Sequence, residues 1–342
     1  MSNILIEAKN SKIKITATDL DIIYFEEILP KDVKKEGSTT TSASTLYDIL
    51  RRLQPNASID FSLLNKNKLK LVSGNSKFNL LCLPADNFPL IEEDIEQKKF
   101  EVSSQKLLRL LNKTKISISN DETRHYLNGI YLHKIKLENK SFLCGVSTDS
   151  HRLSSSSLEI DPDIDIESII LPKKTIFQLI SLLEQSSKTI KISNNKSKIK
   201  FEMDIGILIS KVIDGRFPDY DKVVPKDNNK ILEIKLNEFK NSVERVTTVS
   251  SDRKEALKMF ISKNSVQFAV NSPNSGEGIE IIDAKFNSED LKISFNSRYL
   301  MDIASQIENE TIILNLKDPG SPALIKDFSD KNSFHVVMPM KI

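Results

Sequence analysis

The stretch PKKTIFQLISLL (172–183) decides the fold, because two other segments repeat its pattern at nearly constant spacing. SASTLYDILRRL begins at Ser42 and NSRYLMDIASQI begins at Asn296, so the three segments start 130 and 124 residues apart. In each segment apolar residues recur every three or four positions, which predicts an amphipathic helix with one buried face. Each segment also starts at a residue that is common at helix beginnings. The chain is therefore predicted to contain three copies of one structural unit.

Strands follow these helices. KTIKISNNKSKIKFEM (188–203) and NASIDFSLLNKNKLKLVS (56–73) alternate apolar and polar residues around Asn-rich turns, which is typical of half-buried antiparallel strands. A preceding helix occurs only in two units, at 103–115 and 237–251, while the first unit opens directly on a predicted strand pair at 4–18. We expect an α+β fold whose first domain lacks its opening strand and helix. The predicted domains are 1–98, 99–225 and 226–342.

Composition excludes several classes of protein. The 342 residues include 49 Lys plus Arg and 47 Asp plus Glu, so the net charge of +2 cannot by itself hold the chain on nucleic acid. Cys82 and Cys144 are isolated in apolar contexts, which argues against a disulfide framework or a zinc cluster. No apolar run approaches the roughly 18–20 residues of a membrane helix. We expect a cytoplasmic protein.

Catalytic and cofactor motifs are weak. STDSHRLS (147–154) brings together Asp149, Ser150 and His151, but in a strand the serine and histidine would point to opposite faces and could not form a catalytic pair. A turn at a strand end and the wall of a binding pocket are the alternative interpretations. SGNSK (73–77) lacks the spacing of a phosphate-binding loop, and the four histidines are dispersed. We expect no catalytic residue, no metal and no cofactor.

Basic residues concentrate on a predicted helix. SSQKLLRLLNKTK (103–115) holds Lys106, Arg109, Lys113 and Lys115 without any acidic residue. An ordinary solvated face explains this pattern as well as a surface that follows DNA phosphates with little reading of base sequence. The chain end VVMPMKI (336–342) is unusually apolar, so it is either a core strand or part of a groove that accepts varied peptides.

Four strings together carry a resemblance to a known family. RHYLNGI (124–130), TDSHRL (148–153), DGRFPDY (214–220) and the closing VVMPMKI, in this order and spacing, resemble the bacterial beta sliding clamps, the processivity subunit of DNA polymerase III. The resemblance runs from about Asn3 to Ile342. It implies domains with helices inside and antiparallel sheets outside. It also implies that two chains form a six-domain ring around duplex DNA and lack catalytic activity of their own.

The resemblance further implies partners and sites. The expected partners are double-stranded DNA, the replicative polymerase (a DNA-directed nucleotidyltransferase), an ATP-driven clamp loader and other proteins that carry a short apolar clamp-binding peptide. The positions that match the family's peptide pocket are Leu127, Thr148, His151, Arg152, Leu153, Pro218, Lys222, Val223, Asn296, Tyr299, Pro322, Val336, Val337, Met338, Pro339 and Met340. The positions expected to face DNA are Arg124, His125, Tyr126, Lys106, Arg109, Lys173 and Lys174, and those expected at the dimer interface are Phe78, Leu80 and Val249.

This sequence departs from the family in two mild ways and one larger way. Lys222 stands where many members have Arg, and the chain ends in Lys341-Ile342 where Arg-Leu is common. Lysine loses the two-pronged hydrogen bonding of arginine, so the pocket's preference is expected to shift slightly. The larger departure is the expected incompleteness of the first domain. It leaves open an alternative in which the protein binds peptides as an interaction scaffold without closing a ring.

Overall fold

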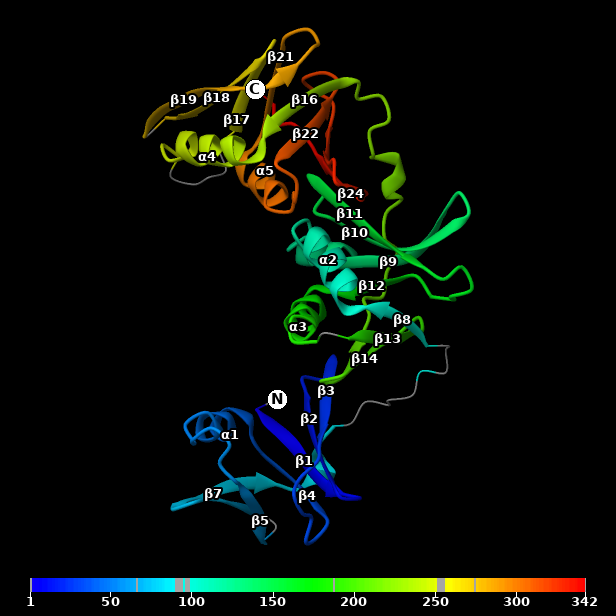
Figure 1. Ribbon diagram of the computed structural model, residues 1–342, viewed down its shortest axis with the longest axis vertical. Coiled ribbons are helices and arrows are strands. Elements are labelled where there is room, and N and C mark those ends of the chain that lie inside the picture. Colours follow the sequence, from blue (N-terminus) through cyan, green and yellow to red (C-terminus); the bar gives the residue numbers. More distant parts are fainter. Residues whose placement is uncertain are drawn as a thin grey trace. The chain divides into compact units, whose positions relative to one another are not determined.

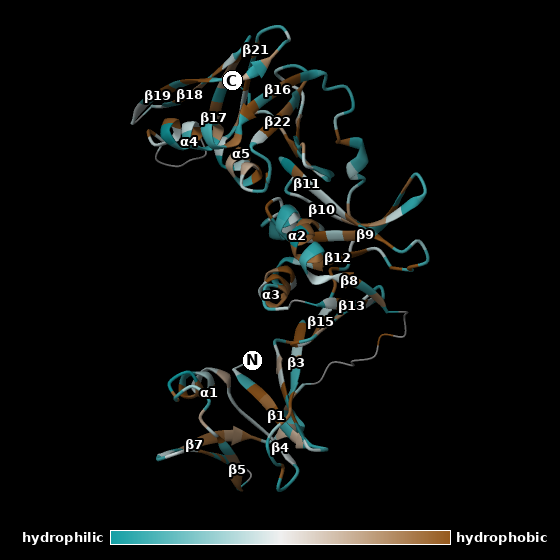
Figure 2. Ribbon diagram, in the orientation of Figure 1, coloured by the Kyte–Doolittle hydropathy of each residue, from teal (hydrophilic) through white to brown (hydrophobic). Residues whose placement is uncertain are grey.

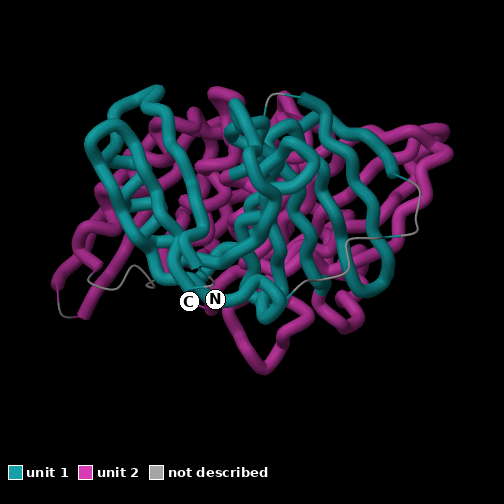
Figure 3. The backbone as a smooth tube through the Cα atoms, turned by 90° about the horizontal axis from the view of Figure 1, so that it is seen from below, with its two compact units in different colours: residues 1–104, 182–212 teal, residues 105–181, 213–342 magenta. Residues whose placement is uncertain are grey.

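The computed structural model describes residues 2–65, 67–89, 95, 99–186, 188–250, 256–273 and 275–341. The chain divides into two compact units (Figure 3): unit 1 comprises residues 1–104 and 182–212, and unit 2 comprises residues 105–181 and 213–342. The division passes through the predicted central domain because the strands of that domain belong to two different sheets. The predicted boundary at 98/99 includes Lys98, which lies outside the described residues, and both predicted boundaries stay predictions.

Unit 1 is built on one antiparallel sheet with the strand order β5-β6-β7-β4-β1-β2-β3-β15-β14-β13-β8. Figure 2 shows the apolar stretch along β1 that helps to form its core. The elements (Figure 1) are β1 Asn3–Lys9, β2 Lys12–Thr18, β3 Ile22–Ile28, β4 Gly37–Ser42, α1 Ala43–Leu50, β5 Asp60–Asn65, β6 Lys68–Ser73, β7 Ser76–Leu83, the 3-10 turn η1 Ala85–Asn87, β8 Phe100–Ser103, β13 Thr189–Asn194, β14 Lys198–Met203 and β15 Gly206–Lys211.

Unit 2 holds two sheets, ordered β12-β9-β10-β11-β24-β23-β22-β16-β20 and β19-β18-β17-β21. Its elements are α2 Ser104–Lys115, η2 Glu122–Leu127, β9 Gly129–Leu137, β10 Lys140–Thr148, β11 Arg152–Ile160, β12 Ile169–Pro172, α3 Lys173–Leu183, η3 Tyr220–Lys222, β16 Lys230–Lys235, α4 Leu236–Thr247, β17 Ala256–Ser262, β18 Ser265–Ser272, β19 Gly276–Asp283, β20 Lys285–Phe286, β21 Leu291–Asn296, α5 Ser297–Ala304, β22 Thr311–Leu316, β23 Ala323–Asp327 and β24 Asp330–Val337.

The three repeated helices of the sequence are confirmed as α1, α3 and α5, and two of them begin with the predicted caps. The Ser42 hydroxyl accepts a hydrogen bond from the Thr45 N–H, and the Asn296 side chain accepts from Arg298 and Tyr299. Such side chains satisfy backbone donors that have no partner within the first turn of a helix. The helix expected at 237–251 is α4, which ends at Thr247.

The repeat extends to the way in which successive domains join. In the central domain the second strand of the last hairpin, β15, pairs with β3 of the first domain, with Ile209 opposite Ile23. In the third domain the equivalent strand β24 pairs with β11 of the central domain, with Val336 opposite Leu153. Each internal junction is therefore a continuous antiparallel sheet. Within the described residues no helix has both the length and the apolarity needed to cross a membrane.

Candidate functional site

The chain end is held against the turn between β10 and β11. The Met338 N–H donates to the His151 carbonyl at 2.9 Å, and the Met340 N–H donates to the Ser294 carbonyl at 2.7 Å. Together with the pairing of β24 and β11, these bonds bring the predicted pocket residues 148–153 and 336–340 side by side in unit 2. The apolar chain end is thus both of the things that the sequence allowed: a core strand through Val337 and a surface segment after it.

Arg152 ties this turn to α5. Its guanidinium lies 3.1 Å from the Asp149 carboxylate and 2.6 Å from that of Asp302, and it stacks 4.3 Å from the Tyr299 ring centre. The Arg152 side chain is only 9% exposed. Burial also raises the pKa of Tyr299. Arg152 and Tyr299 therefore hold the turn between β10 and β11 against α5.

The linker that precedes the third domain is anchored by aromatic side chains. Phe217 is buried and stacks on Tyr131 with ring centres 5.0 Å apart, and Tyr131 stacks in turn on His133 at 4.3 Å. The His133 Nε2 lies 2.9 Å from the Tyr220 hydroxyl. Burial lowers the pKa of His133 to about 4, so this imidazole stays neutral at physiological pH. Between these anchors the linker presents Pro218 to the surface.

The predicted pocket residues fall into two groups. Leu127, Leu153 and Val336 are at most 3% exposed and belong to one cluster with Phe217. Among the predicted pocket residues, the exposed apolar surface comes mainly from Val223 at 53% and Met338 at 43% exposure. Pro218 and Lys222 are also exposed, Val337 is buried, and Thr148, Pro322, Pro339 and Met340 are half-buried. Asn296 is committed to capping α5, and the Pro322 carbonyl accepts a bond from Asn228.

Sequence reasoning missed the anchors Tyr131, His133 and Tyr220. The available signal was local: Tyr131 and His133 alternate on β9 and so share one face of the sheet. Their aromatic partners come from the linker, almost ninety positions further along the chain, and no periodic pattern connects the two segments.

A second cluster joins α2 to the third domain through ion pairs, of which Lys113 and Asp330 are buried. The Arg109 guanidinium lies 2.9 Å from Glu308 and 2.7 Å from Asp330. Lys113 is 2% exposed, donates to the Gln306 carbonyl at 2.9 Å and lies 3.3 Å from Asp330. The Arg109 hydrogen bond lowers the pKa of the Glu308 carboxyl. Neither a solvated face nor a surface that follows DNA phosphates describes Lys113, because its side chain is buried in a domain junction.

Comparison with known proteins identifies the family. Three family models match the chain in order: the N-terminal domain of the DNA polymerase III beta subunit at residues 1–92, its central domain at 101–219 and its C-terminal domain at 221–341. The chain belongs to the bacterial beta sliding clamp family. Members of this family are non-catalytic subunits of DNA polymerase III and serve processive DNA replication.

Individual relatives and solved structures agree with this assignment. The beta sliding clamp of Caulobacter vibrioides is 34% identical over all of this chain and 92% of its own length, and that of Escherichia coli is 28% identical with the same coverage. A crystal structure of the Caulobacter crescentus clamp superposes with a TM-score of 0.96, 34% identity and coverage of 100% and 91%. The clamp of Bartonella birtlesii bound to griselimycin gives 0.95, 37% identity and coverage of 100% and 91%. The three-domain clamp fold is therefore shown.

The residues expected to face DNA in this clamp occupy varied surroundings. Lys106 is exposed on α2, whereas Lys173 bonds to Asn120. Arg124 lies 2.8 Å from Asp121 and donates to the Ser150 hydroxyl at 2.6 Å. The remaining three are His125, whose Nε2 lies 3.1 Å from the Asp214 carbonyl, the half-buried Tyr126, and Lys174, which also has an interaction partner. Their contact with DNA stays a prediction, and two members of the set, Arg109 and Arg124, already pair with acidic residues of their own chain.

The argument against a catalytic pair in STDSHRLS assumed that these residues lie in a strand, and that assumption was wrong. Residues 149–151 form the turn between β10 and β11, and Ser150 has a positive φ of 76°. The Asp149 carboxylate accepts from the backbone N–H groups of His151 and Arg152, and the Ser150 hydroxyl accepts from Arg124. The Asp149 carboxylate, the Ser150 hydroxyl and the His151 N–H therefore shape this turn, which contains residues of the predicted peptide pocket. Over the described ranges, no group of three or more His, Cys, Asp or Glu is placed to hold a metal ion.

The predicted dimer residues lie in the first and third domains. Leu80 on β7 is 8% exposed and belongs to the first domain's own core, where Phe78 packs beside it. Val249, just after α4, packs on the core of the third domain. On β7 the exposed apolar side chains are Leu81 and Leu83, at 78% and 60%. These two side chains are the most exposed apolar surface that β7 offers to another chain, and Phe78 is half-buried.

Proposed function

We propose that two copies of this clamp-family chain close head to tail into a ring around duplex DNA. The observation that carries the proposal is a pair of open strand edges at equivalent places. β7 occupies the position of β15 and β24 in the repeat, and β19 occupies that of β3 and β11. In the described residues β7 is paired only with β6 over Ser76–Leu81, and β19 ends its sheet.

Pairing β7 of one copy with β19 of the other would repeat a junction that the chain already makes twice. Such an interface joins two different surfaces, so it forms a closed ring when the rotation between copies completes a circle. The edge of β19 exposes Ile279 and Ile281, at 55% and 64%, and these residues would meet Leu81 and Leu83. Exposed apolar strand edges of this kind are unusual unless a partner covers them.

The ring would hold DNA by topology, so its contacts to phosphates can stay weak and uniform. A net charge of +2 with basic side chains such as Lys106 on a helix suits this requirement. The experiment is retention on circular DNA, with light scattering to measure the oligomer. Ile279→Lys with Ile281→Lys should give monomers that load poorly, while Lys258→Glu on β17 of the same sheet should not. If the unaltered chain is monomeric and slips from circular DNA at the same rate as from linear DNA, the ring proposal fails and the scaffold alternative stands.

We further propose that the replicative polymerase, the clamp loader and related partners bind through the pocket at the chain end. Its exposed apolar surface around Val223 and Met338 suits leucine or phenylalanine anchors, each contributing about 1.5–3 kcal/mol when fully buried. Deleting residues 338–342, of which Ile342 lies outside the described residues, should abolish binding of a clamp-binding peptide and leave the dimer intact. Unchanged peptide affinity would show that the pocket is elsewhere.

Two further proposals concern the first domain and the cellular location. We propose that the first domain is incomplete relative to the other two, because residues 2–89 as described contain one α-helix, α1, and the other domains contain two each. We also propose a cytoplasmic location, which is supported by Cys82 and Cys144, both buried and free.

A further inference from the structure

The turn between β10 and β11 has a counterpart between β2 and β3 of the first domain. Residues 148–152 read TDSHR and residues 18–22 read TDLDI. In both turns the threonine hydroxyl donates to the carbonyl four residues later, at 2.7 and 2.8 Å, and the aspartate carboxylate accepts two backbone N–H groups. The third residue has a positive φ in each turn, 76° at Ser150 and 82° at Leu20. The backbone of this turn therefore forms without an arginine at its last position.

The strand that follows each turn in the sheet also holds the two copies in the same way. The Met338 N–H donates to the His151 carbonyl at 2.9 Å, and the Lys211 N–H donates to the Asp21 carbonyl at 2.9 Å. The side chains differ, however. Lys211 and Asp21 form an ion pair of 3.1 Å at this place, whereas the central-domain copy has Met338 and His151 there. The central-domain copy has its ion pairs on Arg152 instead.

Arg152 joins the turn to the third domain. Its Nε lies 3.1 Å from the Asp149 carboxylate within the turn, and its Nη1 lies 2.6 Å from the Asp302 carboxylate on α5. The guanidinium also stacks 4.3 Å from the ring centre of Tyr299, and the Arg152 side chain is 9% exposed. One guanidinium thus pairs with carboxylates of two domains, a geometry that suits the planar fork of arginine better than the ammonium of lysine.

The charged link is a property of one junction. Asp302 and Gln178 hold the same position in the repeated helices α5 and α3, and Ile22 stands where the central domain has Arg152. Isoleucine and glutamine cannot form an ion pair. The link therefore belongs to the junction whose two sides carry the predicted peptide pocket, with residues 148–153 on the central domain and residues 336–340 on the third.

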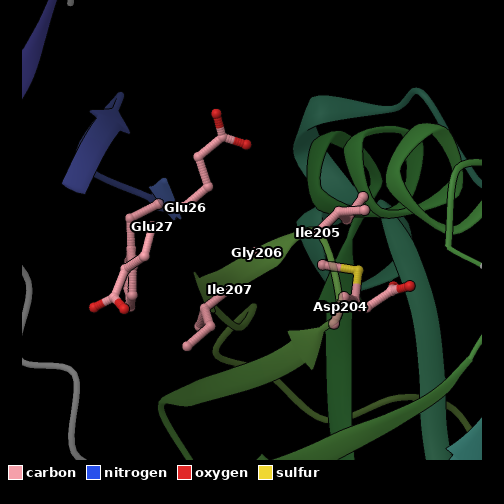
Figure 4. A pocket seen from close by; sticks show the side chains of 8 residues that line it. Glu26, Glu27, Asp204, Ile205, Gly206 and Ile207 are labelled. Carbon is pink, nitrogen blue, oxygen red and sulfur yellow. The ribbon is translucent and has the colours of Figure 1, made fainter. Parts of the chain in front are cut away.

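A cavity of the first domain lies away from that domain's copy of the turn. It has a volume of about 300 Å³, and Figure 4 shows acidic side chains around it, including Glu26, Glu27 and Asp204. These residues come from the end of β3 and from the segment between β14 and β15, whereas the turn 18–22 precedes β3. This cavity and the first-domain turn are therefore separate features, and the turn that contains predicted pocket residues is the one with the arginine.

We propose that Asp302, which is not one of the predicted pocket residues, is a positioning residue for partner binding. It acts through Arg152, which it holds so that the turn stays at a fixed place relative to α5 and the chain end. β11 and β24 pair as far as Arg152 and Val337, and beyond that point the Met338 bond and this ion pair link the turn to the third domain. Without the ion pair the turn spends less time in the arrangement that accepts a peptide, so the apparent Kd rises. The inference rests on the proposed partner pocket.

The test titrates a fluorescent peptide with leucine and phenylalanine anchors into the full chain and follows its anisotropy. Asp302→Ala should weaken binding about tenfold, the equivalent of one hydrogen bond to a charged group. Asp302→Glu keeps the carboxylate and should recover most of that affinity. Asp290→Ala is the matched control, because it removes an exposed acid of the same domain and should leave the affinity unchanged.

A double-mutant cycle separates positioning from a general effect on folding. Arg152→Gln with Asp302→Ala should bind the peptide no more weakly than Arg152→Gln alone, because both changes remove the same link. In Asp302→Ala the Met338 amide should exchange faster with solvent, while the urea midpoint of the whole chain changes little, since the Asp302 side chain is 35% exposed.

Three results would overturn the inference: unchanged peptide affinity in Asp302→Ala, fully additive losses in the cycle, or a loss of affinity that follows a fall in the urea midpoint. Failure of the proposed pocket gives a different result. In that case the peptide does not bind the unaltered chain, or it still binds after deletion of residues 338–342, and the inference falls with the pocket.

Discussion

Replacing Lys113 with methionine removes a positive charge from the buried junction between α2 and the third domain. The Lys113 ammonium lies 3.3 Å from Asp330, 3.4 Å from Glu308 and 4.0 Å from Asp327, and its side chain is 3% exposed. Methionine keeps most of the aliphatic volume but cannot neutralise these carboxylates. Arg109 still pairs with Asp330 and Glu308. Asp327 loses the Lys113 ammonium, which lies 4.0 Å away.

The expected cost is large for a single substitution. Asp327 and Asp330 have side chains that are 1% and 3% exposed, so neither can regain its hydration once the ammonium is gone. Removing one partner of a buried ion pair typically lowers the free energy of unfolding by about 3–5 kcal/mol. The remaining guanidinium of Arg109 moves the expected loss toward the lower end, about 3 kcal/mol. Lys106→Met on the exposed face of α2 is the control, with an expected change within about 0.5 kcal/mol.

The assay is urea unfolding of the full chain, monitored by far-ultraviolet circular dichroism. Tryptophan fluorescence cannot be used because the sequence contains no Trp. A double-mutant cycle with Asp330→Asn then isolates the coupling between the two side chains, and we expect Asp330→Asn to cost less in the Lys113→Met background than alone. If Lys113→Met and Lys106→Met shift the unfolding midpoint equally, the junction does not depend on this charge and the reasoning is refuted.

Three further outcomes follow from the structure. Burial lowers the pKa of His133 to about 4 and that of His335 to about 3, whereas a histidine in the unfolded chain has a pKa near 6.5. The folded protein therefore keeps its full stability above pH 6.5 and loses stability as the pH falls below that value. At pH 5 each histidine should cost about 2 kcal/mol, measured as urea midpoints against pH, and flat midpoints between pH 7.5 and 5 would contradict this. Gly145→Val should lower the unfolding free energy by about 1–3 kcal/mol, because a Cβ there meets Leu110 at 2.6 Å; an unshifted melting temperature would show that α2 can move aside. Tyr220→Phe removes the hydroxyl that lies beside the His133 Nε2, and the Nδ1 of the same ring already has no hydrogen-bond partner. The substitution should lower the free energy of unfolding by about 1–3 kcal/mol. Equal stability of the two proteins would mean that water replaces the hydroxyl.

Local pattern was sufficient for most elements of the fold. The period of the apolar residues predicted α1, α3 and α5, and the residues Ser42 and Asn296 predicted two of their caps, because helix formation and capping depend on neighbours within a few positions. Alternation predicted the strand pairs in the same way. The threefold repeat and the four quoted strings were enough to indicate the family, which the comparisons then established.

Sequence patterns could not show which polar and aromatic side chains meet across the fold. Lys113 looks like a solvated residue of a basic helix until β23 and β24 bring acids to it from more than two hundred positions away. The sequence pattern suggests a strand for Ser150 and His151, whereas the structure places them in a turn. Phe217 contacts Tyr131 only because the linker packs against β9.

The amino-acid sequence by itself determined the repeated unit, its helices and strands, and the family to which the chain belongs. Only the tertiary structure decided which basic residues are buried in a domain junction, which of the predicted pocket residues are buried or exposed, and which strand edges stay open. The physical reason is that periodicity and capping are short-range properties of a chain, whereas burial, ion pairing and edge exposure depend on which distant segments come together.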